Sequence, residues 1–107
     1  MPLDAPAAGW PLQREMHDFV ESRGWYSADS AKPQEPRNLA ISLALEAAEV
    51  LEHFQWGETV DVEALSDELA DVVLYAVQLA NVVGIDIDQA ARAKLELNRS
   101  RWGQSHS

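Results

Sequence analysis

Apolar residues recur at helical spacing in four segments of the chain, residues 11–23, 37–56, 62–83 and 86–101. In the first segment, Leu12, Met16 and Phe19 fall on one face of a helix. None of the chain has the strict alternation of apolar and polar residues that is typical of a half-buried strand. The pattern therefore predicts an all-α fold, a four-helix bundle.

Capping residues stand at the ends that this periodicity predicts. Asp61 is a good N-cap for the third helix, and Asp86 with Gln89 three residues later has the form of a capping box for the fourth. The first three helices are each expected to stop at a glycine, namely Gly24, Gly57 and Gly84. These signals predict one domain over residues 11–102, with flexible ends at residues 1–10 and 103–107.

The connection between the first two helices is long for a small bundle. Pro33 and Pro36 rule out a continuous helix across residues 25–37. Because connections of this length in compact domains often carry function, we expect this one to have a functional role.

The third predicted helix is apolar around most of its circumference over residues 72–83. Such a helix must be covered on nearly all sides, and three neighbours in a chain of 107 residues hardly suffice. With no cysteine in the chain, oligomerisation or a bound metal is the expected source of extra stability. We predict a homodimer or homotetramer. The segment is too short to span a bilayer, so no membrane partner is expected.

Acidic residues are concentrated in the middle of the chain. The formal net charge is -10, which disfavours polymeric nucleic acid and anionic membranes as partners. Residues 38–91 hold eleven Asp or Glu and no Lys or Arg. Buried carboxylates in this stretch would need a partner from elsewhere, such as a divalent cation. The alternative is a well-solvated acidic face.

Two pairs of carboxylates lie close to apolar faces. On a helical wheel, Glu46 and Glu49 fall inside the apolar arc of the second helix, where unpaired charges are costly. Glu68 and Asp71 share one face of the third helix. Antiparallel packing would bring the two pairs together as an oxygen-only site, which suits Mg²⁺ or Mn²⁺. A di-iron carboxylate bundle is the competing interpretation of this pattern. It needs Glu three residues before His, but Val50 stands three residues before His53, so the sequence disfavours it.

Several motifs together resemble the MazG-like all-α nucleotide pyrophosphohydrolases, and within them the dCTP pyrophosphatase branch most closely. The resemblance covers residues 12–102. It is carried by Pro-Arg-Asn-Leu at 36–39, Glu-x-x-Glu at 46–49, His-Phe-Gln-Trp at 53–56, Glu-Leu-Ala-Asp at 68–71 and Asn-Arg-Ser-Arg at 98–101. The chain departs from the family pattern at Trp102, where the family has tyrosine, and in its short link at residues 57–61.

The resemblance implies hydrolysis of a nucleoside triphosphate to the monophosphate and pyrophosphate, at sites built between the chains of a dimer or tetramer. Magnesium, for which Mn²⁺ can substitute, would be held by Glu46, Glu49, Glu68 and Asp71, with Glu49 also acting on the attacking water. It further implies that the substrate is bound by His17, Trp25, Trp56, Tyr75, Lys94, Asn98 and Arg99. Alternatively, the aromatic residues and His17 belong to the core.

We therefore expect a cytoplasmic enzyme that cleanses the nucleotide pool, acting on dCTP or a related pyrimidine nucleotide. The same chemistry on another nucleoside triphosphate is the nearest alternative, because stacking discriminates poorly between bases. A helical interaction module that binds metal without catalysis is the alternative from a different class.

Overall fold

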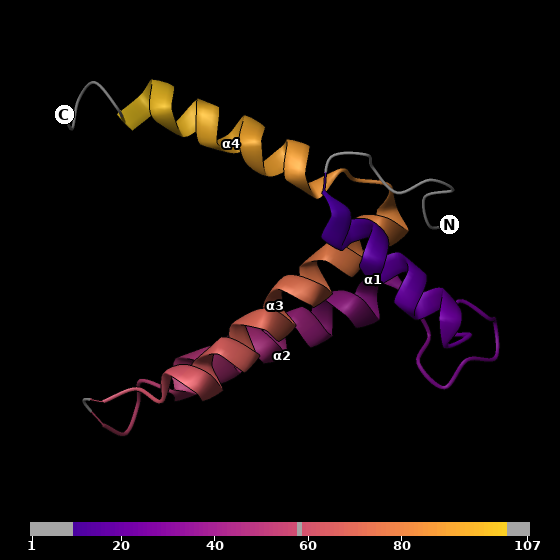
Figure 1. Cartoon of the computed structure of the whole chain (residues 1–107), viewed down its shortest axis with the longest axis horizontal. Coiled ribbons are helices and arrows are strands. Elements are labelled where there is room, and N and C mark those ends of the chain that lie inside the picture. Colours follow the sequence, from indigo (N-terminus) through magenta and orange to yellow (C-terminus); the bar gives the residue numbers. More distant parts are fainter. Residues whose placement is uncertain (1–9, 58, 103–107) are drawn as a thin grey trace.

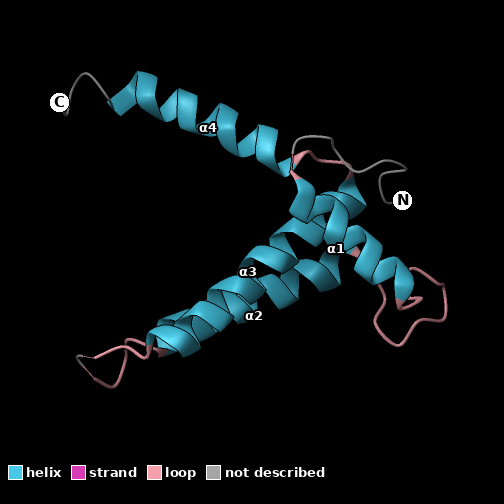
Figure 2. Cartoon of the chain, viewed as in Figure 1, coloured by secondary structure: helices cyan, strands magenta, loops and turns pink. Residues whose placement is uncertain are grey.

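The computed structural model describes residues 10–57 and 59–102, and over these ranges it contains helices joined by turns and loops, without a strand (Figure 2). The expected flexible ends lie outside the described residues, apart from Trp10, which precedes the first helix. The helices are α1 (Pro11–Ser22), α2 (Pro36–Glu52), α3 (Val62–Val83) and α4 (Ile87–Trp102).

The ends of α3 and α4 follow the capping signals of the sequence. Asp61 accepts a hydrogen bond from the backbone N–H of Ala64 at 3.2 Å, and Asp86 accepts one from that of Gln89 at 3.0 Å. Gly84 closes α3 with a φ of 79°, a left-handed conformation that glycine adopts without strain. These predicted boundaries are confirmed.

The predicted extension of α2 to Trp56 is wrong, because the helix ends at Glu52. The backbone N–H groups of His53 and Phe54 bond to carbonyls three residues back, in tight turns. Trp56, at the end of these turns, is 90% exposed. Because most of the stability of a helix comes from packing, an exposed Trp56 does not stabilise a further helical turn.

The helices form an open arrangement rather than a closed bundle (Figure 1). α2 and α3 lie antiparallel and side by side, and α1 crosses the C-terminal part of α3. α4 turns away from α3 by 107° and buries none of its residues. The radius of gyration is 16.4 Å, against about 13 Å for a compact chain of this length.

The interior is small and lies where α1 meets α3 and the first turn of α2. Its buried apolar residues are Val20, Leu39, Val77, Ala80 and Val82. Buried polar side chains lie beside them, namely Gln13, His17, Gln78 and Asn81. Across the described ranges, no single helix is long and apolar enough to cross a membrane.

Candidate functional site

Three of the four predicted carboxylates meet between α2 and α3. One carboxylate oxygen each from Glu46, Glu68 and Asp71 lies within 4.8 Å of the other two, and we call these residues the carboxylate cluster. The antiparallel packing of α2 on α3 brings the two acidic pairs together, as their positions on the helices predicted.

Glu46 lies close to other carboxylates, and its pKa responds to them. Hydrogen bonding with Glu49, and then with Glu68, raises the pKa of Glu46 to about 8, and burial and the charges of both neighbours act in the same direction. Its Oε2 atom is buried and has no hydrogen-bond partner. An oxygen-only donor set with an unpartnered buried oxygen fits Mg²⁺ or Mn²⁺.

Glu49 lies beside the cluster but not within it. Its side chain is exposed, and it lines a hollow of about 280 Å³ together with Glu52, His53 and Glu68, which we call the acidic hollow. His53 Nε2 lies 3.7 Å from Glu68 Oε1. The sequence did not assign a role to His53, although it lies on the same side of the helical wheel as Glu46 and Glu49, which was a signal.

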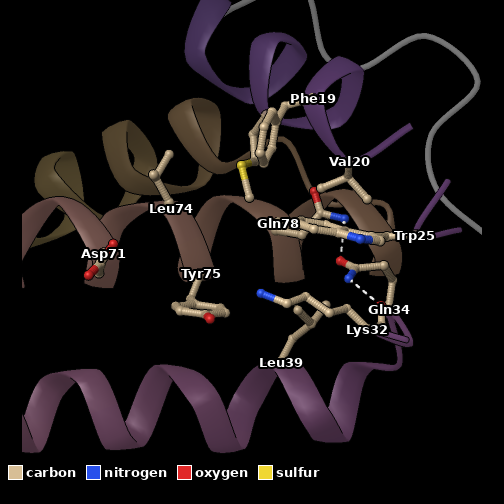
Figure 3. Close-up of a pocket in the computed structure, with 11 residues that line it drawn as sticks. Phe19, Val20, Trp25, Lys32, Gln34, Leu39, Asp71, Leu74, Tyr75 and Gln78 are labelled. Atoms are coloured by element: carbon tan, nitrogen blue, oxygen red, sulfur yellow. Dashed lines mark hydrogen bonds between the residues drawn. The ribbon is translucent and has the colours of Figure 1, made fainter. Parts of the chain in front are cut away.

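A second concave surface opens between α1, α3, the start of α2 and the loop of residues 23–35 (Figure 3). This aromatic cavity has a volume of about 200 Å³. Asp71 belongs to both the cavity lining and the carboxylate cluster, so the two sites adjoin. The cavity's aromatic and polar lining residues besides Asp71 are Phe19, Trp25, Lys32, Gln34, Tyr75 and Gln78.

Two of the predicted substrate residues, Trp25 and Tyr75, line the aromatic cavity. Trp25 is held against Phe19, edge to face, with 5.5 Å between the ring centroids. His17 is buried and does not line the cavity, because its Nδ1 is hydrogen-bonded to the Tyr26 hydroxyl at 2.9 Å. Trp56 is exposed on the turn after α2.

The predicted substrate-binding residues Lys94, Asn98 and Arg99 are not brought to the carboxylates within one chain. They lie on α4, which projects away from the α2–α3 pair (Figure 1). Arg99 Nη1 instead pairs with Glu96 Oε2 at 2.7 Å on its own helix. The sequence also missed Lys32, Gln34 and Gln78, and the one available signal was a glutamine inside the apolar segment 72–83.

Comparisons with known proteins agree on one family. The model of the MazG-like family matches residues 41–107. Mouse dCTP pyrophosphatase 1 is 33% identical over a 100-residue alignment that covers 83% of this chain and 56% of the mouse protein. Its human counterpart is 34% identical with the same coverage. The chain thus spans about half the length of these curated relatives.

Two further relatives broaden the comparison. The dATP/dGTP diphosphohydrolase of cyanophage S-2L is 46% identical over 39 residues, which cover 36% of this chain and 37% of the phage protein. Among solved structures, a pyrophosphatase from Archaeoglobus fulgidus matches with a TM-score of 0.65 and 34% identity, over 85% of this chain and 88% of that one.

Proposed function

The chain belongs to the MazG-like family, and on that premise we propose that it is a magnesium-dependent nucleoside triphosphate pyrophosphohydrolase. The observation that carries the proposal is the carboxylate cluster at the edge of an aromatic cavity. Such a site suits a ligand with a flat ring at one end and a metal-binding phosphate chain at the other. The products would be the nucleoside monophosphate and pyrophosphate, and the role would be cleansing the cytoplasmic nucleotide pool.

In this proposal Glu46, Glu68 and Asp71 hold Mg²⁺ or Mn²⁺, and Glu49 completes the site from the adjoining hollow. Bound Mg²⁺ would neutralise the triphosphate and make a nearby water more acidic. Glu49 is the candidate to orient or deprotonate that water. Its exposed carboxylate contacts Glu46 yet lies outside the cluster, which supports a role towards solvent rather than towards the ion alone.

The base would lie in the aromatic cavity, against Trp25 and Tyr75. Aromatic rings stack on nucleobases with about 1–3 kcal/mol per base. Because Asp71 lines the same cavity, a base held there directs its phosphates towards the carboxylate cluster. For His17 we propose a supporting role, since it holds Tyr26 behind the cavity.

The preferred substrate is dCTP or a related pyrimidine deoxynucleotide, as the names of the mammalian relatives suggest. The name of the phage relative favours a second candidate, the same chemistry on a purine deoxynucleotide.

We further propose a homodimer or homotetramer in which α4 of a second copy brings Lys94, Asn98 and Arg99 to the phosphates. A single chain leaves these residues remote from the carboxylate cluster. The helices also expose large apolar side chains that a second copy would cover, namely Leu45 of α2, Leu69 and Val73 of α3, and Leu95 and Leu97 of α4. Sedimentation should therefore give a dimer or tetramer, and a stable monomer at micromolar concentration would contradict this part.

The test of the activity is pyrophosphate release from a panel of deoxy- and ribonucleoside triphosphates, with and without Mg²⁺. We expect release that requires Mg²⁺ and is fastest with a pyrimidine deoxynucleotide. A folded, metal-loaded protein that releases no pyrophosphate from any of them would instead support a non-catalytic interaction module.

A further inference from the structure

We propose that Lys32 reads the nucleobase, donating a hydrogen bond from its ammonium group to a carbonyl oxygen of the ring. The site would then favour cytosine, thymine, uracil and guanine, which carry such an oxygen, over adenine, which carries none. The inference rests on the proposed function, because it concerns the same cavity.

Lys32 reaches the aromatic cavity from the loop between α1 and α2. Its Nζ lies 4.9 Å from the centroid of the Trp25 ring, a cation–π distance. Figure 3 shows the side chain extended towards Tyr75, with its nitrogen between the two aromatic residues. The ammonium group is therefore beside the surfaces that would stack on a base.

The backbone of Lys32 is fixed, although its side chain is exposed. Its N–H donates to Ser30 Oγ at 2.9 Å, and its carbonyl accepts from Gln34 Nε2 at 2.8 Å. Gln34 is in turn anchored by the buried Gln78, whose Nε2 donates to Gln34 Oε1 at 3.1 Å and to the Tyr26 hydroxyl at 3.0 Å. One buried side chain of α3 thus holds the loop on both sides of Lys32.

Lys32 is the one cationic residue among the residues that line the aromatic cavity, which otherwise offers aromatic, apolar and amide groups together with Asp71. None of the ion pairs found in the described part of the chain involves it. The amide N–H groups of Gln78 already have partners in the protein. The N–H groups of the ammonium are thus the strongest hydrogen-bond donors that the cavity presents to a ligand.

The position favours the base over the phosphates. Asp71 and Lys32 lie on opposite sides of Tyr75 in Figure 3. A nucleotide whose phosphates extend towards Asp71 and the carboxylate cluster therefore presents its base to Lys32. Because an ammonium group can donate but not accept, it complements the carbonyl oxygen of cytosine, thymine, uracil or guanine. Adenine has no such oxygen and offers only ring nitrogens as acceptors.

The experiment measures binding of unphosphorylated nucleosides without metal, by NMR at millimolar concentration, to the full chain and to Lys32→Met. We expect the variant to bind deoxycytidine and thymidine about tenfold more weakly, as loss of a hydrogen bond to a charged group implies. Binding of deoxyadenosine should change little. Lys32→Arg, which keeps the donors, should retain most of the preference.

Arg23→Met is the matched control. Arg23 also stands over an aromatic ring, with its Cζ 5.4 Å from the Phe19 centroid, but it does not line the aromatic cavity. Like Lys32→Met, it removes one positive charge from a protein whose net charge is -10. If Lys32→Met and Arg23→Met weaken deoxycytidine binding equally, the loss comes from the change in net charge, and the proposal is overturned.

Three other results would also overturn it: equal weakening for all nucleosides, weakening only when triphosphates are used, or no nucleoside binding by the wild-type chain. Circular dichroism establishes that each variant is folded. Nucleoside binding requires no hydrolysis, so the two proposals can fail separately. A chain that releases no pyrophosphate but loses deoxycytidine binding in Lys32→Met would refute the enzyme and keep the base contact.

Discussion

The two halves of α3 differ sharply in what surrounds them. In the C-terminal half, residues 77, 78, 80, 81 and 82 are buried within the chain. In the N-terminal half, Leu69 is 47% and Val62 is 75% exposed, and two carboxylates face α2. The same helix therefore contributes to the core at its C-terminal end and to the carboxylate cluster at its N-terminal end.

The contrast follows from the partners available to each half. At the C-terminal end, Gln13 of α1 clamps the α3–α4 turn, donating to the Ile85 carbonyl at 2.6 Å and accepting from the Ile87 N–H at 3.1 Å. Asn81 donates to the Gln13 carbonyl at 3.0 Å. At the other end Glu46 has an unpartnered buried oxygen. In the core end Asn81 Oδ1 is likewise buried without a hydrogen-bond partner, but the neighbouring amide groups are bonded within the chain, whereas at the acidic end three carboxylates lie together.

The largest effect is expected at the acidic end. Glu49→Gln should lower kcat by about 10²–10⁴-fold, the usual range for loss of a general base. The fold should persist because the side chain is exposed. Steady-state pyrophosphate release and circular dichroism would measure both. Glu52→Gln, which removes the same charge from the same acidic hollow, should stay near wild type. If kcat falls equally in both variants, the effect comes from the loss of negative charge in the acidic hollow and not from a specific role of Glu49.

The core end should respond in stability. Gln13→Ala removes both hydrogen bonds of a fully buried side chain and strands their partners, so we expect a loss of about 2–4 kcal/mol in the free energy of unfolding. Urea denaturation measures it. Gln89→Ala, at an exposed position of α4, should cost no more than about 0.5 kcal/mol. Similar costs at the two positions would mean that the Gln13 clamp contributes little.

The sequence predicted the features of the molecule that depend on local spacing along the chain. Helical periodicity and capping residues identified all four helices, and three-residue spacing identified both acidic pairs. The partners of Gln13 lie 72 and 74 residues away, and Gln78 bonds to Gln34 at a separation of 44 residues. No local pattern encodes such contacts. Lys32 lies in a loop without periodicity, so only the folded chain brings it to the aromatic cavity.

The stability of the protein should depend on pH through Glu46, at the acidic end. In the metal-free fold the pKa of Glu46 is raised to about 8, against 4.5 for an ordinary glutamate. Between these values the folded state binds more protons than the unfolded state, so stability is full below the window and falls as pH rises through it. Thermal unfolding in a chelator should follow this trend. Glu46→Gln should flatten it, and Mg²⁺ should stabilise more at higher pH because it binds the ionised form. An unchanged slope in Glu46→Gln would contradict the assignment to this residue.

The smallest effect tests whether the acidic end is held only locally. Asp61 caps α3 through a single hydrogen bond to the Ala64 N–H, on an exposed side chain. Asp61→Ala should cost about 1 kcal/mol, as N-cap losses usually do. If the two halves of α3 are as independent as their surroundings suggest, amide exchange should quicken in the first turns of α3 while the amides of Gln78 and Asn81 keep their protection. Faster exchange over the whole helix would instead show that α3 opens as one unit, and that the cap at the acidic end also stabilises the core.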